Sequence, residues 1–540
     1  MNKIIIYISI LVIAVFSVAY LYFSNLNIGS KNNDKALSLI PQSAALIFSF
    51  TNDKSFYEIF KEYELFDAIT GTKNKVEFAA LKEGLLDSRT LRLITSGQTL
   101  FLSFHPQKSD SIATLWTMPL LKEVSREDFI QALNQNKKIS SKWFDLNGIQ
   151  FTEINILSIN KPFYLFMNKG VATGSFSQKL LLETINNKVP KIEADFIEEI
   201  NSGSLKSSNS PANVFLNLGG SKEFLLAFLR QKKTNGNFNL LNNLSGFSTL
   251  NMNYKSDALM FDGITVTDTL KSSYLNLFLH QQPVSNPITR IVPENTAYFL
   301  AFGISDYRVF AKDLKEFHRK ENQLSKLNEQ ISLITKETGI QPNRDIQKYW
   351  GNEFIFFQLS NREKLGAVKL SNGRQMNFFL QSLSSEYSEN IWRLNYSGIL
   401  YNYFGEPFKS FESPFYSIID NYLIVSNSPG SIQRFLNNYN SENLLYKTSK
   451  FQEFNRLVSD KSNMLLFIHS QNSKDNFNSL LKRSYTKTLN DKDHGFKNFY
   501  GVSYQWSSDG NRFFTNFYAA TKQLVEPKLK DIETDSLQTN

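Results

Sequence analysis

The chain has 540 residues, 41% of them hydrophobic and 14% aromatic, which predicts large buried cores and more than one domain. Its formal net charge of +9 comes without a dense block of Lys or Arg, so nucleic-acid binding, which needs a clustered basic surface, is not expected. The absence of Cys excludes disulfides, thiolate zinc sites, iron–sulfur clusters and Cys nucleophiles.

Residues 4–23 form an almost unbroken apolar segment, IIIYISILVIAVFSVAYLYF. This is about the length that crosses the hydrocarbon core of a bilayer as a helix. We therefore predict a transmembrane anchor at residues 1–24 and a polar spacer at 25–35, with all later residues extracytoplasmic. A cleaved signal peptide is the alternative, because Ser17-Val18-Ala19 offers the small residues that a signal peptidase needs.

The rest of the chain contains an internal repeat. The segments IPQSAALIFSF and VPENTAYFLAF place Pro41 and Pro293 in the same context, at an offset of 293 − 41 = 252. The segments KPFY and SPFY place Pro162 and Pro414 at the same offset, 414 − 162 = 252. Further matches follow in the same order at similar offsets, so the pattern indicates a tandem duplication.

This repeat predicts two homologous modules and the segments that flank them. The modules are expected at 36–282 and 288–520, with a linker at 283–287 that contains Pro283 and Pro287. Residues 521–540 are polar and charged without a pattern, and they predict a flexible tail.

Within each module, alternating apolar residues predict strands and helical spacing predicts helices. The expected strands are at 44–50, 99–104, 112–118, 163–167, 171–175, 213–218 and 297–302, with hairpins over 144–155, over 247–254 and 259–267, and over 502–506 and 512–518. The expected helices are at 56–66, 76–86, 128–133 after an N-cap at Ser125, 178–186 and 223–229. Because hairpins link most strands, we expect an α+β fold with an antiparallel or mixed sheet and helices on one face.

The opening segment Leu39-Ile40-Pro41-x-x-Ala44-Ala45, behind an apolar anchor, resembles a bacterial family of membrane-anchored proteins classified only as a domain of unknown function. Matching residues lie at 39–50 and 291–302. The resemblance implies a location in the bacterial envelope, which here means the periplasm. It implies no activity and carries over no functional residues.

Few residues suggest chemistry. The five His do not pair at metal-binding spacing, and Asp491, Asp493 and His494 are better explained as a solvated loop than as a metal site. Ser479 and Lys482 fit the S-x-x-K nucleophile motif, but its companion motifs are missing. Catalytic residues therefore stay unknown, and no cofactor or metal is expected.

These observations favour a non-enzymatic binding or scaffold protein, tethered to the membrane, whose partner is an envelope protein, a lipid or a glycan. An extracytoplasmic hydrolase of unfamiliar type is one alternative, and it predicts a deep pocket with clustered polar residues. A periplasmic chaperone or transport accessory for apolar cargo is the other alternative, and it predicts an apolar cavity or groove.

Overall fold

The computed structural model describes residues 33–62, 76, 78–86, 89–107, 111–146, 148–159, 161–206, 210–230, 243–255, 258–490 and 498–522. Two compact units divide these residues. Unit 1 contains the described residues up to Gly220, and unit 2 contains those from Ser221 onward. Within each unit the strands pair antiparallel.

Unit 1 is built on a sheet in which every strand pairs antiparallel with its neighbours, in the spatial order β8-β1-β2-β3-β7-β6-β5-β4. Its strands are β1 (Leu46–Thr51), β2 (Thr99–Pro106), β3 (Ile112–Pro119), β4 (Ile139–Leu146), β5 (Ile149–Ile156), β6 (Phe163–Asn168), β7 (Val171–Ser175) and β8 (Asn213–Asn217). Its helices are α2 (Lys54–Glu62), a π-turn (Lys82–Leu86), α4 (Arg89–Thr95), α5 (Arg126–Asn134), α6 (Gln178–Ile185) and α7 (Ala194–Lys206). Ser125 caps α5 as the sequence predicts, since its hydroxyl accepts from Asp128 N at 3.1 Å.

Unit 2 contains a longer antiparallel sheet, in the order β9-β10-β22-β21-β20-β12-β13-β14-β18-β17-β16-β15. Its strands are β9 (Phe247–Lys255), β10 (Ala258–Val266), β12 (Thr296–Gly303), β13 (Trp350–Leu359), β14 (Lys364–Leu370), β15 (Ser384–Ser388), β16 (Ile391–Leu394), β17 (Phe415–Ile419), β18 (Tyr422–Ser426), β20 (Met464–His469), β21 (Phe499–Ser508) and β22 (Phe513–Thr521). Two short strands, β11 (Val284–Ser285) and β19 (Lys461–Ser462), pair separately.

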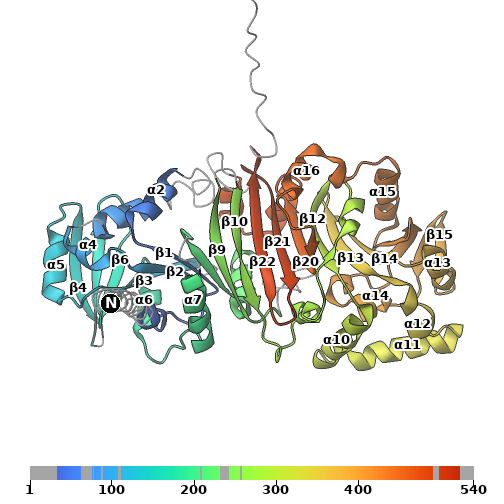
Figure 1. The fold of residues 1–540 in the computed structure, drawn as a ribbon, viewed down its shortest axis with the longest axis horizontal. Coiled ribbons are helices and arrows are strands. Elements are labelled where there is room, and N and C mark those ends of the chain that lie inside the picture. Colours follow the sequence, from blue (N-terminus) through green and yellow to red (C-terminus); the bar gives the residue numbers. More distant parts are fainter. Residues whose placement is uncertain are drawn as a thin grey trace, which may run out of the picture. The chain divides into compact units, whose positions relative to one another are not determined.

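Helices cover both faces of the unit 2 sheet, where the sequence predicts them on one face. Figure 1 shows α10, α11, α12 and α14 along one side of β12–β14, and α15 and α16 along the other. The helices of this unit are α8 (Ser221–Phe228), α10 (Tyr307–Lys320), α11 (Leu324–Thr338), α12 (Pro342–Asp345), α13 (Gly373–Gln381), α14 (Ile399–Phe404), α15 (Pro429–Asn440), α16 (Ser449–Asn455), α17 (Lys474–Leu480) and α18 (Arg483–Leu489), and 3₁₀ turns include η3 (Tyr274–Phe278) and η4 (Pro287–Ile291). The reason lies in β13, where Phe354 and Phe356 enter one core while Ile355 and Phe357 enter the other.

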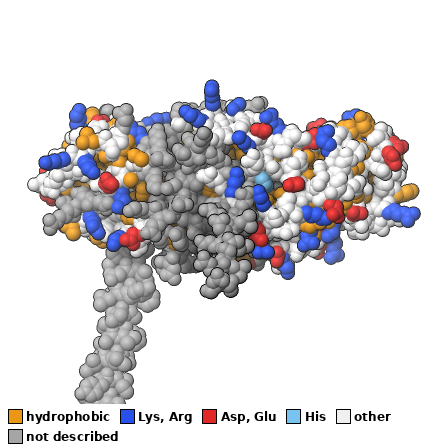
Figure 2. Space-filling model, turned by 90° about the horizontal axis from the view of Figure 1, so that it is seen from above, with side chains coloured by type: hydrophobic (Ala, Val, Ile, Leu, Met, Phe, Trp, Pro, Cys, Tyr) orange, Lys and Arg blue, Asp and Glu red, His pale blue; other side chains and the backbone are white. Residues whose placement is uncertain are grey.

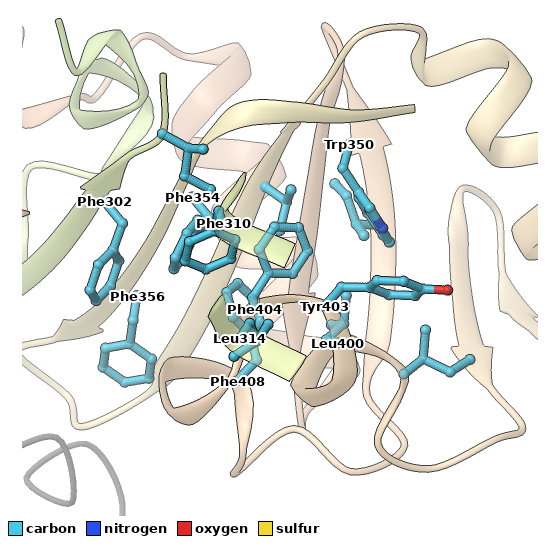
Figure 3. Close-up of a cluster of buried hydrophobic side chains, with 14 of the residues drawn as sticks. Phe302, Phe310, Leu314, Trp350, Phe354, Phe356, Leu400, Tyr403, Phe404 and Phe408 are labelled. Atoms are coloured by element: carbon cyan, nitrogen blue, oxygen red, sulfur yellow. The ribbon is translucent and has the colours of Figure 1, made fainter. Parts of the chain in front are cut away.

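Aromatic rings fill the larger of these two cores (Figure 3). Phe354 is fully buried, and its ring stacks on Phe302 with centroids 4.5 Å apart. The rings of Phe404 and Phe310 lie 5.0 and 5.9 Å from the same ring. Phe354 on β13 therefore joins β12, α10 and α14 in one cluster.

The strand orders of the two units correspond. We match β1 with β12, β2 with β13 and so on in chain order, passing over the short strand β19, so that β8 is matched with β20. The unit 1 order β8-β1-β2-β3-β7-β6-β5-β4 then reads β20-β12-β13-β14-β18-β17-β16-β15. Unit 2 contains this order. The hairpin of β9 and β10 lies in unit 2, where β10 pairs with β22. In that pairing Gly263 is opposite Thr515, and their separation, 515 − 263 = 252, equals the repeat offset.

The predicted transmembrane helix at 1–24 is not supported. Those residues, like most of the spacer and tail, lie outside the described residues. Among the described residues no helix is long and apolar enough to cross a membrane, because a span needs about 20 apolar residues. The longest of them, α11, has 15 residues and carries charges such as Lys326 and Glu337. The fold class is therefore corrected to antiparallel sheets with packed helices, and the described residues do not support the predicted single-pass membrane location.

Truncation of Phe354 tests the aromatic core. We expect Phe354→Ala to lower the free energy of unfolding of unit 2 by about 3–5 kcal/mol, because it removes a buried ring and leaves a cavity. Phe378→Ala is the matched control: Phe378 is 67% exposed, so its loss should change stability by less than about 0.5 kcal/mol. Urea unfolding followed by circular dichroism measures both, and equal effects would contradict the assignment of Phe354 to the core.

Candidate functional site

An apolar cavity of about 110 Å³ lies in unit 2. Its floor is one face of β12, β13, β20 and β21, and its walls are η3 and α17. The lining residues are Leu244, Tyr274, Leu275, Tyr298, Leu300, Phe356, Met464, Leu466, Ile468, Ser473, Asn476, Phe477, Leu480 and Trp506. The volume is somewhat smaller than the apolar cavity of about 150 Å³ that binds benzene or xenon in an engineered protein.

The floor arises from the register of four neighbouring strands. Leu300 on β12 is opposite Phe356 on β13 and Leu466 on β20, and Leu466 is opposite Tyr504 on β21. Residues directly opposite in adjacent strands place their side chains on the same face. One apolar row therefore crosses the sheet, and Leu300 and Leu466 remain half-buried within it.

Helix α17 forms one wall and is attached to the sheet by polar contacts. Ser473 Oγ donates to Ala297 O at 2.6 Å, and Asn476 Nδ2 donates to Leu359 O at 3.2 Å. Phe477 and Leu480 lie three residues apart on this helix and both line the cavity. The polar side chains thus hold the helix in place while its apolar side chains face the cavity.

Among the described residues, the cavity lining contains no Asp, Glu, His, Lys or Arg. The Tyr274 hydroxyl already has a hydrogen-bond partner, because it donates to Phe404 O at 2.5 Å. Burial raises the pKa of Tyr274 well above its ordinary value. Two buried atoms of lining residues, Trp506 Nε1 and Asn476 Oδ1, have no hydrogen-bond partner among the described residues. Each such atom costs about 1–3 kcal/mol when it is left unpaired.

Unit 1 contains a smaller apolar cavity of about 80 Å³ between its sheet and helices. Trp116 on β3 and Phe163 on β6 line it. Phe163 covers Gly174 on β7 so closely that a Cβ there would lie 2.4 Å from the ring. This cavity lies on β3, β6 and β7, whose counterparts in the matched strand order are β14, β17 and β18, so it is not the counterpart of the cavity in unit 2.

The structure does not bring together the residues of the S-x-x-K match. Ser479 Oγ donates to Asn476 O at 2.7 Å, and Lys482 Nζ donates to Ala227 O at 2.5 Å. Each side chain is held by a different backbone carbonyl, which does not resemble a nucleophile and its base. Asp491, Asp493 and His494 lie outside the described residues, and the described residues contain no group of three potential metal ligands.

The sequence did not predict a hydrogen-bonded chain in unit 1 that consists of Ser43, His105 and Ser103. Ser43 Oγ lies 2.9 Å from His105 Nδ1, and Ser103 Oγ lies 2.8 Å from His105 Nε2. Since Ser103 Oγ also contacts Leu115 O at 3.5 Å, we assign its proton to that carbonyl and the imidazole proton to Nε2. Ser103 and His105 are two residues apart on one strand face, but Ser43 is distant in the sequence and only the pairing of β1 with β2 brings it close.

This chain is poorly suited to activate Ser43 as a nucleophile. His105 is fully buried, and burial lowers its pKa from 6.5 to about 3. A general base works best when its pKa is near the working pH. The neutral imidazole therefore links β2 to the turn that precedes β1.

Charged side chains of both signs lie on the described surface. On the face that Figure 2 shows, Lys and Arg side chains are interspersed with Asp and Glu over the described residues. A nucleic-acid interface needs a basic stripe. The visible face agrees with the absence of Lys and Arg blocks in the sequence.

Residues 258–494 match the model of a family described as "Protein of unknown function (DUF3352)". The expected likeness to a domain of unknown function is thus confirmed for this part of the chain. The matched segment contains every lining residue of the unit 2 cavity except Leu244 and Trp506. The chain matches none of the curated proteins and none of the solved structures with which it was compared.

The buried imidazole makes the stability of unit 1 depend on pH. The pKa of His105 in the folded state, about 3, is below its ordinary value of 6.5, so the unfolded state binds more protons between these values. The free energy of unfolding should therefore fall as the pH falls, by roughly 2 kcal/mol between pH 7 and pH 5 from this group.

His105→Leu should remove this contribution, whereas Ser43→Ala should retain it because the imidazole stays buried. Urea unfolding at both pH values, read by hydrogen exchange of the β2 amides, measures unit 1 separately. An unchanged pH dependence in His105→Leu would show that another group is responsible.

Proposed function

We propose that this chain is a binding protein and that unit 2 takes up an uncharged apolar group in the cavity between β12, β20, β21 and α17. The observation that carries the proposal is the lining, in which apolar and aromatic side chains predominate and, of the part of the chain that the structure describes, no charged side chain takes part. Small-molecule sites are typically concave and apolar, with few polar groups.

The energetics favour occupation of this space. The half-buried side chains Leu300, Leu466 and Ile468 lose contact with water when an apolar group covers them. Burial of apolar surface contributes about 25 cal/mol per Å². An empty apolar cavity also forgoes dispersion contacts that a ligand restores.

The chemistry of the lining selects among the expected partners. A glycan presents hydroxyl groups on most of its surface and needs many hydrogen-bonding side chains, which this cavity does not offer. A lipid-like molecule or another small apolar compound matches the walls. The expectation of apolar cargo therefore fits this site better than the expectation of a hydrolase, since the lining holds no acid–base pair.

We also infer that the chain consists of two copies of one module, at 36–282 and 288–520. The corresponding strand orders support this inference. Duplication does not imply two equal sites, because the unit 1 cavity lies over different strands.

Filling the cavity tests the proposal. Toluene should raise the midpoint of thermal unfolding of the full chain, because a ligand that binds only the folded state stabilises it. In Leu466→Trp the indole should occupy the cavity and reduce toluene affinity at least tenfold. Leu333→Trp is the matched control on α11, where Leu333 is 47% exposed, and it should bind toluene normally.

Calorimetric titration with toluene measures these affinities directly. Failure of the wild-type chain to bind toluene would refute the proposal. Equal binding by Leu466→Trp would place the bound toluene elsewhere.

A further inference from the structure

The unit 1 cavity lies where small side chains interrupt an apolar face of the sheet. On the central strand β7, Ala172 is opposite Met118 of β3 and Met167 of β6. Gly174, two residues further along β7, points to the same face, and all four residues line the cavity. The short side chains of β7 therefore leave a gap between longer neighbours, and Ala172 is only half-buried.

Matching hydrogen bonds align β7 with its counterpart in unit 2, β18. Ser175 Oγ, at the end of β7, donates to Thr114 O at 2.7 Å. Ser426 Oγ, at the end of β18, donates to Lys364 O at 2.9 Å. The two acceptors lie on β3 and β14, which are counterparts in the matched strand order. The segments VATGS and YLIVS therefore correspond residue by residue.

In this alignment, unit 2 has larger residues where unit 1 has small ones. Leu423 takes the position of Ala172, and Val425 takes the position of Gly174. Both larger side chains are buried in the aromatic core of unit 2. Unit 1 thus lacks two side chains that fill this face of the sheet in unit 2.

The connection that covers this face is also shorter in unit 1. In unit 2, β16 and β17 are joined by 414 − 394 = 20 residues, which include α14 and a 3₁₀ turn (Glu406–Phe408). The rings of Phe408 and Phe411 lie against β14, since a Cβ on Gly366 would be 2.7 and 3.2 Å from them. In unit 1, β5 and β6 are joined by 162 − 156 = 6 residues, LSINKP, none of them aromatic.

We propose that unit 1 binds an uncharged aromatic group in this cavity, in the place that unit 2 fills with its own side chains. This site is separate from the unit 2 cavity and adds a second binding function to the chain. None of the described residues that line it is charged, so a charged group would be buried there without a partner.

The walls favour a flat ring over an aliphatic group. Trp116 and Phe163 contribute aromatic rings to the lining, and aromatic pairs gain energy beyond the burial of area. Met118 and Met167 contribute thioether sulfurs, which make favourable contacts with aromatic rings. The volume of about 80 Å³, against about 110 Å³ in unit 2, suits a single ring.

A surface groove of about 260 Å³ marks the side from which a ring enters. Leu91, Ile94 and Phe129 line both the groove and the cavity. These side chains, on α4 and α5, therefore stand between the inner space and the groove. Rotamer changes of such side chains open a path without a change in the sheet.

Methionine methyl resonances test the two sites separately, because Met118 and Met167 line the unit 1 cavity and Met464 lines that of unit 2. Benzene is the probe, since this cavity is the smaller one. In nuclear magnetic resonance spectra of the full chain with labelled methionine methyls, benzene should shift the Met118 and Met167 resonances saturably. It should bind there about two- to tenfold more tightly than cyclohexane, which has as many carbon atoms but no π-system.

One substitution assigns the binding to this cavity. Ala172→Leu introduces the residue that unit 2 has at the corresponding position, and the larger side chain should fill the gap. Benzene affinity at Met118 and Met167 should fall by roughly tenfold or more. Ala194→Leu is the matched control, because Ala194 is exposed on α7, and it should bind benzene normally.

The wild-type spectra decide the case even if Ala172→Leu does not fold. Absence of shifts at Met118 and Met167 would overturn the inference, and equal affinity in a folded Ala172→Leu chain would place benzene elsewhere and overturn it too. Cyclohexane binding as tight as that of benzene would overturn the aromatic class of the ligand. Met464 reports unit 2 alone, so failure of this inference is distinguishable from failure of the proposed function.

Discussion

The alternation of side chains along β12 is the constraint on which unit 2 depends. Phe299 enters the core beneath α15 and α16, while Phe302 enters the core beneath α10 and α14. A strand whose two faces are both apolar must be covered on both sides. Leu300 shares the face of Phe302 but packs only partly buried against its core, and the cavity occupies that part of the sheet.

The same constraint explains how the cavity persists. Polar contacts of α17 with Ala297 O and Leu359 O hold the helix at the sheet, so it cannot collapse onto the half-buried row without breaking them. Protein interiors are otherwise close-packed. An apolar space therefore remains between the sheet and this anchored helix.

β10 and β22 pair antiparallel, with Gly263 opposite Thr515. Gly263 is required there by close packing, since a Cβ at this position would lie 1.9 Å from Thr249 O.

The sequence by itself determined local elements in both units, and it predicts a duplication. Hairpins such as β6–β7 follow from nearby residues, because Lys169 and Gly170 adopt positive φ in the turn. The second helical layer, the cavity and the Ser43–His105 contact were decided only by the tertiary structure. They depend on which strands become neighbours, and strand pairing between distant segments leaves no local pattern in the chain. Asn476 and Trp506 illustrate the limit: the sequence names both residues, but only the fold shows that their polar atoms are buried without partners.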